Sequence, residues 1–122
     1  MKDVFLPSED IISKMRDMLS IASDMTRLKI MLCLLDESKC QCHCHHSNCG
    51  CCEDRPCMIE KCVSEIVEDV KASQSLISHQ LKVLKDFDLV STRREGQKIY
   101  YSLKDGHVKQ LLSVALEHAM ED

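Results

Sequence analysis

The chain has 122 residues and a formal net charge of −4, and only 3% of its residues are aromatic, with no Trp. This length suits one domain over residues 1–122 with a modest core, and the few aromatic residues favour helix-on-helix packing over a large sheet. No apolar stretch reaches the roughly 18 residues of a membrane span and the N-terminus shows no signal-peptide pattern, so we expect a cytoplasmic protein without a membrane partner.

Two amphipathic helices are predicted in the first third of the chain, over residues 8–22 and 24–36. Apolar side chains recur at helical spacing in both ranges, and Asp24 is suited to cap the second helix. Cys33 lies between two leucines of that helix and is predicted to be a core residue. Residues 39–61 then lose this periodicity, which indicates a loop inserted into the domain.

The inserted loop is dense in soft metal ligands, because ten Cys and His side chains fall within eighteen residues. In a reducing compartment such cysteines are expected to be thiols or metal ligands rather than disulfides. The spacing does not match a paired zinc-finger layout, so the loop is a second candidate metal site of undefined stoichiometry, or an insert without a regulatory role. The candidate ligands, with the Cys that follows the loop, are Cys40, Cys42, His43, Cys44, His45, His46, Cys49, Cys51, Cys52, Cys57 and Cys62.

Two more helices are predicted over residues 62–70 and 73–87, joined by a tight turn with Ser73 as the N-cap of the second. This pair is typical of a helix-turn-helix. Strand-like alternation over 89–94 and 97–103, on either side of Glu95-Gly96, predicts a β-hairpin wing. A last helix over 106–120 completes the order ααααββα.

Positive charge is concentrated between Lys71 and Lys104, where seven basic residues stand against three acidic ones. In a helix-turn-helix the second helix enters the major groove, where small polar side chains reach base edges and Lys or Arg neutralise phosphates. A solvated helix face is the alternative for any one of these residues, but their combination with a basic wing favours DNA binding. The candidate DNA-binding residues are Gln74, Ser75, Ser78, His79, Lys82, Lys85, Arg93, Arg94 and Lys98.

The last helix carries Asp105 and His107 at its start and His118 and Glu121 at its end. His107 and His118 share one face, but a rise of about 1.5 Å per residue separates them by roughly 16 Å. One ion cannot reach both pairs, since zinc-type bonds are only about 2.0 to 2.2 Å long. A second copy running antiparallel would bring the pairs together, which predicts a homodimer with two sites of two nitrogen and two oxygen ligands. The alternative is a capping Asp105 with surface His and Glu residues.

The ligand types favour Zn(II), with Co(II) or Cd(II) as alternatives. An apolar stripe on the same helix is predicted to form the dimer seam. Its members are Val108, Leu111, Leu112, Ala115 and Ala119.

Several motifs resemble the ArsR/SmtB family of winged-helix metal-sensing repressors. They are Ser73-Gln74-Ser75 with Ser78-His79-Gln80-Leu81-Lys82, Arg94-Glu95-Gly96-Gln97 through Tyr100-Tyr101-Ser102-Leu103, and Asp105-x-His107. The similarity runs from Thr26-Arg27-Leu28 to the C-terminus and excludes the loop. It implies a mainly α, winged helix-turn-helix homodimer with a β-hairpin. The last-helix quartet resembles the SmtB/CzrA-type zinc sensors, which also implies that metal-bound His118 donates a ring N–H towards a carbonyl near Asp88.

The leading hypothesis is therefore a homodimeric repressor, not an enzyme, which binds an inverted-repeat operator and is released by Zn(II) or a similar ion. Two alternatives stay open. One is a thiolate sensor of Cd(II), Pb(II) or As(III) working through the loop and Cys62, although Cys62-Val63-Ser64 lacks the second thiol of the Cys-Val-Cys motif in such sensors. The other is a metallothionein-like storage protein.

Overall fold

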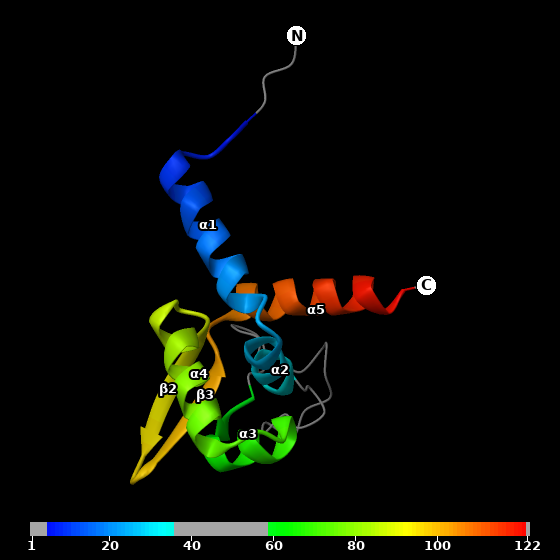
Figure 1. The fold of residues 1–122 in the computed structure, drawn as a ribbon. Coiled ribbons are helices and arrows are strands. Elements are labelled where there is room, and N and C mark those ends of the chain that lie inside the picture. The colour runs from blue at the N-terminus through cyan, green and yellow to red at the C-terminus, as the bar shows by residue number, and fades with distance from the viewer. Residues whose placement is uncertain (1–4, 36–58, 122) are drawn as a thin grey trace, which may run out of the picture.

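The computed structural model describes residues 5–35 and 59–121. Five helices and three strands appear in this part of the chain (Figure 1). The predicted order of four helices, a hairpin and a last helix is confirmed, with one short strand added before the third helix. The elements are α1 (Glu9–Ala22), α2 (Met25–Cys33), β1 (Lys61–Cys62), α3 (Val63–Val70), α4 (Gln74–Asp86), β2 (Val90–Glu95), β3 (Lys98–Leu103) and α5 (Gly106–Met120).

Side-chain caps start the helices at the expected places. The Asp24 carboxylate accepts the backbone N–H of Arg27 at 3.2 Å, and the Ser73 hydroxyl accepts that of Leu76 at 3.2 Å. Each cap satisfies a backbone donor that the first helical turn leaves without a partner. Both predicted caps are confirmed, whereas α2 ends at Cys33 rather than at residue 36.

A short strand that the sequence did not predict, β1, turns the wing into a three-stranded antiparallel sheet of order β1-β3-β2. Lys61 and Cys62 pair with Tyr101 and Tyr100 of β3. The predicted loop end at residue 61 is therefore wrong, because Lys61 lies in this strand and Ile59 is buried. Lys61 is also buried, and its ammonium group donates to the carboxylate of Asp69 on α3. The loop's Cys and His residues lie outside the described residues.

The core is formed by residues of α2, α3, α4, β2, β3 and α5, and by the residues that follow α2 and α4. The partly buried Cys33 packs against it, which confirms its predicted place. None of the residues of α1 is buried, and this helix projects from the body (Figure 1). No described helix is long and apolar enough to cross a membrane. The core residues are Ile30, Met31, Leu34, Leu35, Ile66, Ile77, Leu81, Leu84, Leu89, Val90, Leu103 and Leu112.

Left-handed backbone conformations stand at both ends of α4 and at the tip of the wing. Lys71 has φ 63° in the turn between α3 and α4, and Asp88 has φ 60° in the turn that follows α4. Gly96 has φ 64° between β2 and β3, where a tight hairpin favours glycine. The first two turns connect α4 to α3 before it and to β2 after it, and the third connects the two strands of the wing.

Candidate nucleic-acid interface and metal-binding residues

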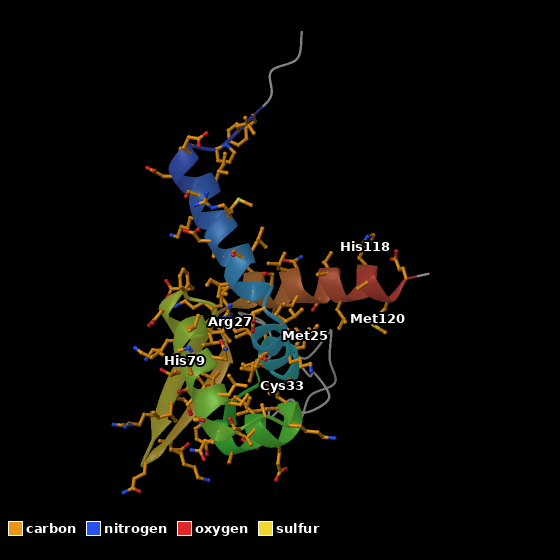
Figure 2. All side chains as sticks on the ribbon, in the orientation of Figure 1. Met25, Arg27, Cys33, His79, His118 and Met120 are labelled. Atoms are coloured by element: carbon orange, nitrogen blue, oxygen red, sulfur yellow. The ribbon has the colours of Figure 1, made fainter. Side chains whose placement is uncertain are left out.

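The rotation of α4 about its axis is fixed by Ile77, Leu81 and Leu84, which are fully buried in the core. Because helix positions repeat every 3.6 residues, the polar side chains between them are left on the opposite face. Figure 2 shows His79 on this helix, away from the core. All six residues predicted on α4 are exposed, namely Gln74, Ser75, Ser78, His79, Lys82 and Lys85. They form one continuous polar face of the size that a major groove admits.

The wing residues Arg93, Arg94 and Lys98 are exposed as well, but they are not equivalent. The Arg93 guanidinium donates from Nε to both carboxylate oxygens of Glu60, at 3.0 and 2.9 Å, and from Nη1 to Glu95 at 3.1 Å. It also lies over the ring of Tyr100, 5.0 Å from the centroid. The hydrogen bond with Glu60, above all, raises the pKa of Arg93. Arg93 therefore links β2 to the segment before β1, and Arg94 and Lys98 are the wing cations without such carboxylate partners among the described residues.

Replacing Glu60 by Gln is expected to release Arg93 for contact with a DNA phosphate. The variant should bind DNA more tightly at low salt, and the slope of log affinity against log salt concentration should steepen by about one. Fluorescence anisotropy over a salt series measures both quantities. Glu68→Gln makes the same charge change at an exposed position of α3 and is the matched control. Equal effects of the two variants would show that net charge, and not Arg93, is responsible.

Asp105 caps the start of α5 and lies beside His107. Its Oδ1 accepts the backbone N–H groups of His107 at 3.0 Å and Val108 at 3.1 Å, so it is the N-cap of the helix. Its Oδ2 lies 3.8 Å from Nδ1 of His107. The capping interpretation and the ligand interpretation are therefore compatible, because each uses a different oxygen of one carboxylate.

The other predicted pair lies at the end of α5, where Nδ1 of His118 is 3.8 Å from Oε1 of Glu121. The side chains of His107 and His118 are 95% and 87% exposed, so both imidazoles are open to solvent. Figure 2 shows His118 near the free end of α5. No three His, Cys, Asp or Glu side chains cluster at metal-binding distance within residues 5–35 and 59–121. Each end of α5 thus supplies two ligands, and the four-ligand site stays a prediction.

The hydrogen bond implied between His118 and a carbonyl near Asp88 does not form within this chain. His118 lies at the far end of α5, whereas α4 and the turn after it lie by the opposite end (Figures 1 and 2). In an antiparallel pair of α5 helices His118 would lie by the start of the second chain's α5, so a hydrogen bond between chains stays a prediction.

The residues of the predicted dimer stripe differ in how far they are buried. Leu112 is buried in the chain's own core, so its assignment to a dimer seam is wrong. Val108 packs against that core but stays partly exposed, and its assignment stays a prediction. Leu111 remains exposed, at 46%. Further large apolar side chains of α5 and α1 are exposed that the sequence interpretation did not assign to a surface. They are Val114, Leu116 and Met120 on α5, and Ile11, Ile12, Met15 and Leu19 on α1.

Cys62 is the one candidate ligand of the thiolate site that the structure describes. It is half-buried at the N-cap of α3, and its Sγ lies 3.2 Å from the hydroxyl of Ser64. Its backbone N–H donates to the Glu65 carboxylate at 3.0 Å. Its position is thus explained by the start of α3, and its role as a ligand stays a prediction.

Comparison with known proteins shows which regulatory proteins this chain resembles. Residues 59–92 match the family model described as "Bacterial regulatory protein, arsR family". The chain is 42% identical over 62 residues to a transcriptional repressor SmtB homolog of Synechocystis, covering 51% of this chain and 47% of that protein. It is 40% identical over 62 residues to a cadmium resistance transcriptional regulatory protein CadC homolog of Staphylococcus aureus, covering 51% of each. The chain spans about half the length of the curated relatives it matches.

Solved structures give the same fold over nearly the whole chain. HlyU of Vibrio cholerae superposes with a TM-score of 0.70 at 24% identity, covering 93% of this chain and 100% of HlyU. The homodimeric winged helix-turn-helix DNA-binding domain Mb0332 of Mycobacterium bovis, described as a possible ArsR-family regulator, superposes with a TM-score of 0.69 at 19% identity, covering 95% and 90%. The fold is thus a winged helix-turn-helix. More narrowly, residues 59–92 are similar to the helix-turn-helix of the arsR family, as the motifs indicated.

Proposed function

We propose that this protein is a metal-responsive transcriptional repressor that binds double-stranded operator DNA as a homodimer. In this proposal α4 of each chain enters the major groove, and Arg94 and Lys98 approach the phosphates beside it. A two-fold dimer requires an inverted-repeat operator with half-sites about one helical turn apart. The exposed apolar residues of α1 and α5 are the surface that a second copy would cover.

The observation that carries the metal response is the placement of two His–carboxylate pairs at opposite ends of α5, each with 3.8 Å between nitrogen and oxygen. Imidazole and carboxylate donors suit Zn(II), and Co(II) or Cd(II) could use the same set. The donors fit such an ion because His107 and His118 are exposed and Asp105 keeps Oδ2 outside its capping hydrogen bonds. The similarity to relatives named as an SmtB homolog and a cadmium resistance regulator supports the proposal.

In this proposal the metal and the DNA are bound by different residues of the chain. The ion would be held by Asp105 and His107 of one chain and by His118 and Glu121 of a second. It would link the two α5 helices. Because one dimer carries both sites, a metal that weakens DNA binding must itself be bound more weakly by the DNA complex, by the same factor. Operator release at high metal concentration follows from this linkage.

A titration under reducing conditions tests the proposal. The full chain is bound to the duplex that it selects from a random DNA pool, and fluorescence anisotropy is followed as Zn(II) and, separately, Cd(II) are added. We expect Zn(II) to release the DNA at about one or two ions per dimer, one for each two-fold related site. Release by Cd(II) alone would instead favour the thiolate sensor, and several tightly bound ions without any effect on DNA affinity would favour storage.

A further inference from the structure

One arginine connects three helices at the junction of α1 and α2. Nε of Arg27 donates to the backbone carbonyl of Ile21 in the last turn of α1, at 2.8 Å. Its Nη1 donates to Oε1 of Gln80 on α4 at 2.7 Å, across 53 positions of sequence. Figure 2 shows Arg27 where α1, α2 and α4 meet.

Arg27 is the donor in both hydrogen bonds of this bridge. A guanidinium has only donors, arranged in a planar fork, so it can bond two acceptors at once in a fixed geometry. The Ile21 carbonyl is one of the terminal acceptors that a helix leaves without an internal partner. The side-chain amide of Gln80 must present its oxygen to Arg27, since the guanidinium cannot accept. Both contacts are partly buried, where such hydrogen bonds are stronger than in water.

This bridge matters because little else fixes the direction of α1. None of its residues is buried, and only Ile21 and Ala22, in its last turn, pack against the core. Gln80 lies on α4 beside the exposed DNA face, directly after His79. A change in the Arg27 geometry would therefore change the angle between α1 and α4.

We propose that Arg27 is a positioning residue that fixes α1 relative to α4, and so sets the separation of the two recognition helices in the dimer. The inference rests on the proposed function, because α1 is exposed apolar surface that a second copy would cover. A change at Arg27 should alter which operator spacing is preferred, and not only how strongly DNA is bound. A residue that merely held the fold together would weaken binding to all spacings alike.

The test compares full-length Arg27→Met with the wild type on three duplexes: the selected inverted repeat, and versions with one base pair added or removed between half-sites. We expect the wild-type preference for its own spacing to fall by about tenfold in the variant, because the substitution removes two hydrogen bonds of a charged group. Arg16→Met removes an arginine that bonds only within α1 and should keep the preference. Gln80→Glu keeps an acceptor for Arg27 and should keep the preference even where affinity falls.

Hydrogen exchange of the free proteins separates this inference from the proposed function. Arg27→Met should speed amide exchange in the last turn of α1 and around Gln80, and Arg16→Met should not. If the wild type selects no DNA, the proposed function is wrong, while the exchange data still decide whether Arg27 joins α1 to α4. An unchanged spacing preference in Arg27→Met would overturn the inference, and unchanged exchange would show that Arg27 does not join α1 to α4.

Discussion

Replacing both His107 and His118 by Ala is expected to abolish the effect of zinc on DNA binding. Coupling between a metal and DNA typically amounts to about 1–3 kcal/mol, or roughly a 5- to 150-fold change in affinity. In the double variant the affinities with and without zinc should become equal, because each end of α5 would retain only a carboxylate. Both imidazoles are largely exposed, so their removal should leave the core intact. The measurement is the ratio of DNA dissociation constants with and without Zn(II).

Glu117→Ala is the matched control, since Glu117 is an exposed acid on the same helix, directly before His118, and lies outside the quartet. It should respond to zinc like the wild type. A double variant that still releases DNA with zinc would move the sensing site away from α5, and a single His107→Ala variant would then be tested for a residual effect. Isothermal titration of metal into each protein gives the stoichiometry independently of DNA.

Leu81→Ala is expected to produce a large loss of stability. Leu81 is fully buried between the other apolar residues of α4 and the rest of the core. Truncation of such a side chain removes its burial energy and leaves a cavity, at a cost of about 2–5 kcal/mol. Since domains of this size are stable by only about 5–15 kcal/mol, much of the native stability should be lost. Urea unfolding followed by circular dichroism measures the change.

Leu76→Ala tests the same chemical change on the same helix at a position that is 39% exposed. It should cost less than half as much as Leu81→Ala, because less apolar surface returns to water and no enclosed cavity forms. Both variants must be compared at one protein concentration, since dimerisation makes apparent stability concentration-dependent. Equal losses would contradict the packing of α4 described above.

Features that depend only on residues close together in the chain could be predicted from the sequence. Helix caps depend on one side chain and the backbone three positions ahead, so Asp24 and Ser73 marked the starts of α2 and α4. The last helix has the predicted bounds of Gly106–Met120 for the same reason. The hairpin tip at Gly96 was also visible, because a positive φ in a short turn favours glycine.

Features that depend on distant partners could not be predicted in this way. β1 has only two residues, and it exists because Lys61 and Cys62 meet β3 some forty positions later. The Glu60–Arg93 pair joins residues 33 positions apart, so the sequence could not show that Arg93 is bonded to a carboxylate. The apolar spacing of α5 showed which residues share a side. It could not show that Leu112 enters the chain's own core while Leu111 stays exposed.

The capping of α5 by Asp105 has a thermodynamic consequence for the proposed metal site. Oδ1 of Asp105 holds the first turn of the helix, and Oδ2 takes no part in this cap. Ordering the helix would therefore require little of the binding free energy of a metal at these residues, in contrast to zinc domains that fold only around their metal. A helix that is already formed leaves that free energy for joining two chains in one relative orientation, which is the quantity that the proposed regulator has to control.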